Sequence, residues 1–305
     1  MRPRVGHIQF LNCLPIYYGL VEGSGILDLD LVKGLPTELN RRLLDGRLDI
    51  SPVSSVEYGR NPDELLLLPG PTVSCRGPVQ SILLLSRRPL DELDGSPVAL
   101  TEASATSQVL LKIILKKRYG VTPEYFLFRD DPAEALQRGD AVLLIGDQAL
   151  KHLHGGPGLT VHDLGQEWWD LTGRGMVFAL WAVRREFAEG HPSIVDHVWR
   201  LFQSSIEHSS ANLRRIAVDA APWESHSATF LEGYFSSLSF GFEEDLVAGL
   251  RRFYDMAAEI GEIPSPPALN FHDPGPFRHR RTLRHEEERP SLLFDKKGNL
   301  REKAP

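Results

Sequence analysis

Strand-like and helix-like segments alternate along the first 185 residues, and this alternation constrains the fold more than any other feature of the chain. Residues 5–11 (VGHIQFL) have the pattern of a strand, residues 15–27 that of a helix, and residues 27–34 that of a second strand. Repeated strand–helix–strand units predict an α/β fold with a largely parallel sheet. After residue 187 the pattern becomes helical, and residues 275–305 carry mixed charges with little apolar periodicity, as in a mobile tail.

Two short segments of the chain resemble each other. Residues 45–55 (DGRLDISPVSS) and 138–148 (RGDAVLLIGDQ) both run from a glycine turn through a buried strand into small polar residues that open a helix. The repeat suggests two similar α/β lobes. Ligands bind at the carboxyl ends of the strands in open parallel sheets, so the loops after these strands are candidate ligand contacts.

Four loops share one chemical character, because each offers small polar groups near the end of a strand or the start of a helix. A helix start leaves backbone N–H groups free, and nearby hydroxyls add donors that can hold a carboxylate without Lys or Arg. The alternative is that these residues only cap helices. Three hydroxyls within residues 104–107 are more than one helix cap needs. The candidates are Ser54, Ser55, Ser81, Ser104, Thr106, Ser107, Gly146 and Asp147.

The first strand leads into a polar amide at Asn12, within HIQFLNCLP. Asn suits a tight turn, and Pro15 cannot continue a ladder, so one interpretation is a plain turn. The other is that the strand delivers an uncharged hydrogen-bonding side chain to a ligand. We favour the second interpretation, with Asn12 ending its strand at the floor of a cleft.

Charge and motifs exclude several classes of function. Thirty-four Lys and Arg against 41 Asp and Glu give a formal net charge of -7, which gives no support to nucleic acid as a partner. Neither a dinucleotide fingerprint nor a phosphate-binding loop is present, and two unpaired cysteines indicate neither disulfides nor zinc. We expect no cofactor and no metal. Without a signal peptide or a long apolar run, we expect a cytoplasmic protein that does not enter the membrane.

Six ordered blocks resemble the chorismate dehydratase family of the futalosine route to menaquinone. They are VGHIQFLNCLPIYYGL, LPTELNRRLLDGRLDISPVSSVEYGR, GPVQSILLLSRRPLDELDG, VALTEASATSQVLLKIIL, DAVLLIGDQAL and VHDLGQEWWDLTG. The resemblance implies a type II periplasmic-binding-protein-like fold, with the substrate held between two lobes. It also implies that chorismate, a small dicarboxylate, loses water to give 3-[(1-carboxyvinyl)oxy]benzoate (3-enolpyruvylbenzoate). One departure is Arg174-Gly175-Met176, where the family usually has leucine, proline and a bulky apolar residue.

The resemblance also suggests roles for the candidate residues. Asn12 matches the family's Asn and is the expected catalytic side chain, while the hydroxyls would bind carboxylates. Asp147 could contact a substrate hydroxyl or cap its helix. Glu57 is the competing catalyst, although we favour for it a pairing with the helix dipole on a solvated face. We expect one lobe over residues 1–86 and 184–274, the other over residues 87–183, and a tail over residues 275–305.

Two other functions fit the same sequence pattern. A non-catalytic carboxylate-binding protein could have this fold, because fold alone does not decide function. The sister enzyme that makes 1,4-dihydroxy-6-naphthoate is a further alternative, although the FLNCLP and SATS blocks match it less well. Each interpretation that uses the candidate residues requires Asn12 and the Ser104–Ser107 turn to share one cavity. Oligomeric state is not predicted.

Overall fold

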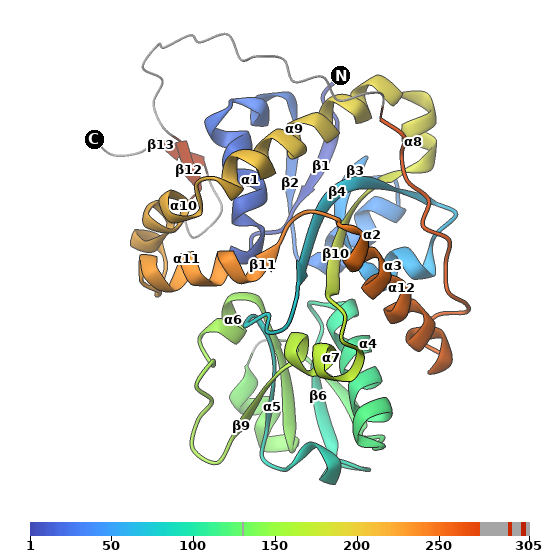
Figure 1. The fold of residues 1–305 in the computed structure, drawn as a ribbon, viewed down its shortest axis with the longest axis vertical. Coiled ribbons are helices and arrows are strands. Elements are labelled where there is room, and N and C mark those ends of the chain that lie inside the picture. The colour runs from blue at the N-terminus through green and yellow to red at the C-terminus, as the bar shows by residue number, and fades with distance from the viewer. Residues whose placement is uncertain (130, 275–291, 295–299, 303–305) are drawn as a thin grey trace.

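The computed structural model describes residues 1–129, 131–274, 292–294 and 300–302. Two β-sheets, each covered by helices, form two lobes that lie one above the other (Figure 1). This is the α/β two-lobed arrangement that the sequence predicts.

The first lobe contains a six-stranded sheet of order β11-β4-β10-β3-β1-β2. Strand β1 runs parallel to β2 and β3, whereas β10 is antiparallel to β3 and β4. The strands are β1 (Arg4–His7), β2 (Asp30–Lys33), β3 (Ile50–Ser54), β4 (Leu65–Cys75), β10 (Met176–Arg184) and β11 (Leu238–Ser239). The helices are α1 (Leu14–Glu22), α2 (Pro36–Leu44), α3 (Ser55–Arg60), α8 (Arg185–Gly190), α9 (Pro192–Ser210), α10 (Leu213–Ala220), α11 (Ala228–Ser237) and α12 (Glu244–Glu259).

The second lobe contains a five-stranded sheet of order β7-β6-β8-β5-β9. Here β6 is parallel to β7 and β8, and β5 is antiparallel to β8 and β9. The strands are β5 (Ile82–Ser86), β6 (Pro97–Thr101), β7 (Glu124–Phe128), β8 (Ala141–Ile145) and β9 (Thr160–Asp163). The helices are α4 (Ala105–Ile114), α5 (Pro132–Arg138), α6 (Gly146–Leu150) and α7 (Leu164–Thr172). Both sheets are therefore mixed rather than largely parallel.

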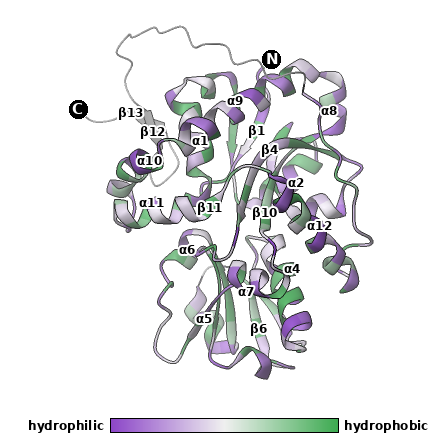
Figure 2. Ribbon diagram, viewed as in Figure 1, coloured by the Kyte–Doolittle hydropathy of each residue, from purple (hydrophilic) through white to green (hydrophobic). Residues whose placement is uncertain are grey.

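The strands supply the core of each lobe. Every residue of β3, β5 and β8 is buried, as expected for strands covered on both faces. Figure 2 shows hydrophobic residues along the strands and hydrophilic residues on outward-facing helices such as α8 and α12. Across the part of the chain that the structure describes, no helix combines the length and apolar character needed to cross a membrane.

The chain changes lobes at different residues from those expected. Strand β5 pairs with β8 and β9 and so belongs to the second sheet, although residues 82–86 were expected in the first lobe. Strand β10 pairs with β3 and β4 in the first sheet, so the return occurs before Met176 rather than at residue 184. The connecting segments are therefore residues 76–81 and 173–175. Hydrogen-bond pairing, which apolar composition does not encode, sets these boundaries.

The C-terminal segment from residue 275 onward lies mostly outside the described residues, including the expected mobile tail. Two short strands within it are described, β12 (Leu292–Phe294) and β13 (Leu300–Glu302), and they pair antiparallel. Strand β12 lies beside α1 (Figure 1).

A buried histidine at the end of β1 makes folding pH-dependent. His7 is 5% exposed, and burial, with the nearby Lys33 charge as a second cause, lowers its pKa to about 4. In the unfolded chain a histidine has a pKa of about 6.5. Between these values the unfolded state binds a proton that the folded state does not, so stability falls as pH is lowered from about 6.5 to about 4.

We expect this group to remove up to about 3 kcal/mol from the free energy of unfolding across that window. Urea unfolding at pH 7 and pH 4.5 measures it when wild type is compared with His7→Gln. The variant should lose less stability on acidification than wild type does. Equal losses in the two proteins would contradict the assignment.

Candidate active site

A small cavity, here called the inner cavity, lies between the lobes and brings together residues from five strands and three α-helices. Its volume is about 50 Å³. Asn12 and both Ser104 and Ser107 line it, so the shared cavity that the sequence predictions require is present. The lining residues are Ile8, Phe10, Asn12, Cys13, Pro36, Ser54, Val73, Ile82, Ser104, Ser107, Ile145, Gly146, Phe178 and Ala179.

Asn12 lies in the inner cavity but does not end a strand. Strand β1 ends at His7, and a 3₁₀ turn over Leu11–Cys13 leads into α1, held by a 3.0 Å bond from Cys13 N to Phe10 O. The expected strand end is therefore corrected to a turn at the start of a helix. The Asn12 Oδ1 atom is buried and has no hydrogen-bond partner among the described residues. A buried polar atom without a partner costs stability, which points to a use other than folding.

The Ser104–Ser107 turn begins α4 beside the cavity. Ser104 Oγ accepts a hydrogen bond from Ser107 N at 3.3 Å and lies 2.8 Å from Ser107 Oγ. Ser104 is thus a helix cap and a cavity residue at once. Thr106 lies differently, because its Oγ1 accepts from Val56 N at 3.2 Å and joins the starts of α3 and α4 across the lobes.

The paired serines at the end of β3 separate in the structure. Ser54 lines the inner cavity, with its N bonded to Asn40 Oδ1 and its Oγ to Asn40 Nδ2, each at 3.2 Å. Ser55 is fully buried and its Oγ donates to Val177 O at 2.7 Å. The structure therefore brings Ser54 to the cavity wall but not Ser55 or Thr106.

Ser81 lies behind the wall rather than on it. Its Oγ donates to Val79 O at 3.3 Å, and its carbonyl accepts from Gly146 N at 2.7 Å. Gly146 has φ of +58°, and a Cβ on it would lie 3.1 Å from the Phe10 ring. Glycine is required there because the backbone is left-handed and the aromatic ring packs directly against it.

A carboxylate that the sequence analysis did not single out holds the connecting segment in place. Asp163, the last residue of β9, accepts from Gly165 N at 2.9 Å and Gln166 N at 3.1 Å as the cap of α7. It also accepts from Val79 N at 2.9 Å and Gln80 N at 2.6 Å, 84 and 83 positions earlier in the chain. An Asp before a helix indicates a cap, but no local signal reveals the distant partners.

Asp147 forms a contact between the lobes. Its Oδ1 accepts from Leu11 N at 3.1 Å, while the cap position of α6 is Ile145, so Asp147 does not cap its own helix. Burial raises the pKa of this carboxyl, and the Leu11 hydrogen bond opposes that shift. Asp147 faces a second space rather than the inner cavity.

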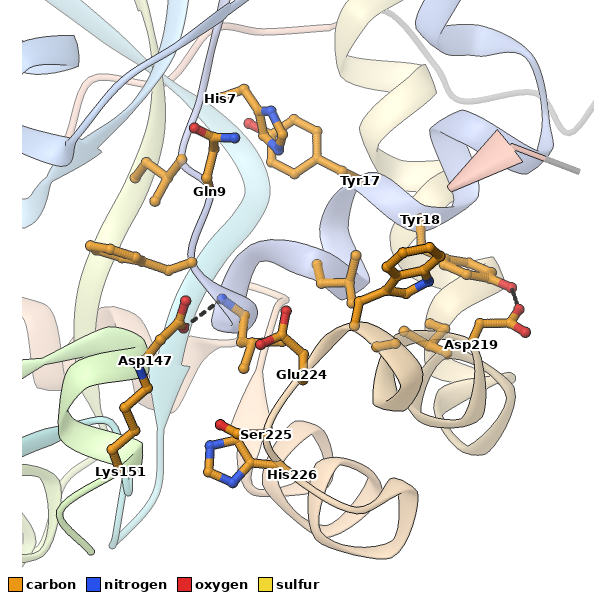
Figure 3. Close-up of a pocket in the computed structure, with 17 residues that line it drawn as sticks. His7, Gln9, Tyr17, Tyr18, Asp147, Lys151, Asp219, Glu224, Ser225 and His226 are labelled. Carbon is orange, nitrogen blue, oxygen red and sulfur yellow. Dashed lines mark hydrogen bonds between the residues drawn. The ribbon is translucent and has the colours of Figure 1, made fainter. Parts of the chain in front are cut away.

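This second space, here called the outer cavity, has a volume of about 240 Å³. In Figure 3, Asp147 of α6 and Lys151, which follows that helix, form one wall, and Glu224, Ser225 and His226 come from the opposite wall, on the segment before α11. Aromatic residues Tyr17, Tyr18 and Trp223 also line it. Apart from Asp147, sequence reasoning missed these residues, because none of them forms a motif.

The wall of the inner cavity contains no charged side chain. Its one titratable group is the Cys13 thiol, whose pKa burial raises well above its usual value. Helices α2 and α4 begin at this wall, and the start of a helix carries the positive end of its dipole, which favours an anion. Among the described residues, no cluster of three His, Cys, Asp or Glu could hold a metal ion.

Two other residues that the sequence left open lie outside both cavities. Glu57 pairs with Arg60 at 2.7 Å, so it is placed as a surface ion pair rather than a cavity residue. Arg174 is exposed in the turn before β10 and lines neither cavity.

Comparison with known proteins identifies the family. A family model described as menaquinone biosynthesis matches residues 3–259. The chain belongs to this family. A chorismate dehydratase of Thermus thermophilus is 35% identical to it over 284 residues, which are 88% of this chain and 98% of the relative. The sequence resemblance to this family is therefore confirmed.

Solved structures support the fold of this family member. The periplasmic aliphatic sulphonate binding protein of Escherichia coli has a TM-score of 0.63 at 15% identity, covering 94% of this chain and 97% of its own. A Candida albicans protein with the generic periplasmic binding protein fold has a TM-score of 0.63 at 11% identity, covering 86% and 91%. At such identities the likeness shows the fold alone, and it confirms the predicted periplasmic-binding-protein-like fold.

Proposed function

We propose that this protein is a hydro-lyase that converts chorismate to 3-enolpyruvylbenzoate and water in menaquinone biosynthesis by the futalosine route. The observation that carries the proposal is the inner cavity, where Asn12 and the Ser104–Ser107 turn meet beside apolar walls without a charged side chain. Membership of a menaquinone biosynthesis family and 35% identity to a chorismate dehydratase support it. Chorismate is a dicarboxylate with an apolar ring, which suits helix starts and apolar walls.

The reaction removes one ring proton and the neighbouring ring hydroxyl. The electrons of the broken C–H bond form the new ring double bond, hydroxide leaves, and the removed proton completes the water. Because the product ring is aromatic, the enzyme has mainly to position the substrate and assist proton transfer. No carboxylate or histidine lines the inner cavity, so the substrate's own enolpyruvyl carboxylate is the proposed base.

Asn12 is the proposed catalytic side chain. Its buried Oδ1 has no protein partner among the described residues and is free to accept from the leaving hydroxyl. An amide is too weak a base to take the ring proton itself, but it can fix the hydroxyl or the enolpyruvyl carboxylate in position. Ser54, Ser104 and Ser107 are the proposed hydroxyl contacts for a substrate carboxylate.

We expect purified protein to convert chorismate, with loss of its ultraviolet diene absorbance and appearance of 3-enolpyruvylbenzoate by mass spectrometry. A protein that is stabilised by chorismate but leaves it unchanged would instead be a carboxylate-binding protein. Formation of 1,4-dihydroxy-6-naphthoate from that enzyme's own substrate, without action on chorismate, would indicate the sister enzyme.

A further inference from the structure

The inner and outer cavities are separated by a thin partition. Ile8 and Phe10 line both cavities, and the remaining partition is formed by neighbours in the chain. Leu11 and Asp147 face the outer cavity, while the adjacent Asn12 and Gly146 face the inner one. The Phe10 ring packs on the Gly146 backbone at this partition, so a ligand that occupied both spaces would have to displace this side chain.

The two cavities differ in volume in a way that matters for a ring dicarboxylate. The inner cavity, at about 50 Å³, has room for only a few water molecules. The outer cavity, at about 240 Å³, approaches the size of small-molecule sites. A ligand with carboxylates attached through two different positions of a ring therefore needs more space than the inner cavity offers.

The two cavities also differ in charge. The Lys151 side chain of the outer cavity forms no hydrogen bond or ion pair with the described residues, and it extends toward Asp147, whose pKa its charge lowers (Figure 3). The nearby acids already have partners: Asp147 accepts from Leu11 N, Asp219 from the Tyr18 hydroxyl at 2.7 Å, and Glu224 also interacts within the protein.

The histidines of the outer cavity add little positive charge. Burial lowers the pKa of His226, with the Lys151 charge as a further cause, and burial also lowers that of His7. Lys151 is therefore the main cation that the described lining residues offer to a ligand.

A substrate carboxylate that acts as a base must not sit beside a cation, because the cation would lower its pKa. The uncharged inner cavity suits that carboxylate, and Lys151 suits the carboxylate that takes no part in proton transfer. We propose that the ligand spans both cavities, with its ring carboxylate on Lys151 and its enolpyruvyl carboxylate beside Asn12. This inference rests on the proposed function and specifies the orientation of the substrate.

The test measures binding of two probes by calorimetry. One is 3-enolpyruvylbenzoate, and the other is 2-phenoxyprop-2-enoate, which lacks the ring carboxylate. We expect Lys151→Gln to weaken binding of the first probe about tenfold and to leave the second unchanged, because only the first reaches Lys151. Lys116→Gln is the matched control, since Lys116 is exposed and lines neither cavity, and it should affect neither probe.

Equal binding of 3-enolpyruvylbenzoate by wild type and Lys151→Gln would overturn this orientation. So would an equal loss for both probes, because the effect would then not depend on the ring carboxylate. Either result leaves the proposed function standing if the wild-type protein still dehydrates chorismate. Failure of the wild type to convert chorismate would reject the proposed function separately.

Discussion

Replacement of Asn12 by leucine should lower kcat for chorismate about 100- to 1,000-fold, the usual loss when one preorganised polar contact to a reacting group is removed. Leucine has nearly the same shape, so the 3₁₀ turn and the packing around it should persist. The measurement is the single-turnover rate of chorismate loss, which separates the chemical step from binding and product release.

Stability should change in the opposite direction from activity. The Asn12 Oδ1 atom is buried without a partner among the described residues, and an apolar replacement removes that cost. The thermal midpoint of Asn12→Leu should therefore equal or exceed that of wild type. A residue that served only the fold would instead lose stability on replacement.

Glu57→Gln is the control for this prediction. Glu57 is engaged with Arg60 on the first lobe and lines neither cavity, so its replacement should leave the single-turnover rate near that of wild type. If Asn12→Leu reacts at the wild-type rate while Glu57→Gln does not, the catalytic assignment is wrong.

The sequence predicts where the strands lie in the chain better than it predicts which strands pair with one another. Apolar runs identify β5 and β10 as buried strands, but the strands that they pair with lie far away in the chain. Ala179 of β10 pairs with Ser54 and Val183 with Ile50 of β3, while Ile82 of β5 pairs with Ile145 of β8. No local pattern encodes partners so distant in the chain, which is why both expected lobe boundaries were displaced.

The candidate site was predictable by residue type but not by side-chain direction. Ser54 and Ser55 are adjacent hydroxyls, yet one lines the inner cavity and the other bonds to Val177 O. Thr106 likewise bonds to Val56 N across the lobes, although Ser104 and Ser107 of the same turn line the cavity. A helix start places successive side chains in different directions, and only the packing of the two lobes decides which of them reaches the cavity.

Replacement of Asp163 by alanine should lower the free energy of unfolding by about 4 kcal/mol, because each N–H group that loses its acceptor costs about 1 kcal/mol. Four backbone N–H groups bond to this carboxylate, two on α7 and two on the segment that joins the lobes. Of those, Gln80 has φ of +61°, a left-handed conformation that is unfavourable for a residue with a side chain. The bond to Gln80 N helps to hold it there.

The matched control is Asp131→Ala, because Asp131 is also an aspartate that caps a helix. Its side chain accepts only from Ala133 N, at 2.8 Å, so its replacement should cost about 1 kcal/mol. Urea unfolding of the two variants measures the difference between their losses in free energy of unfolding. This difference isolates the contribution of the long-range hydrogen bonds to Val79 and Gln80. Ser81 follows Gln80 in the chain, and its carbonyl accepts a hydrogen bond from Gly146 N at the cavity wall. Asp163→Ala should therefore also lower kcat/KM for chorismate. Equal stability losses in the two variants would show that the long-range hydrogen bonds contribute nothing beyond a helix cap.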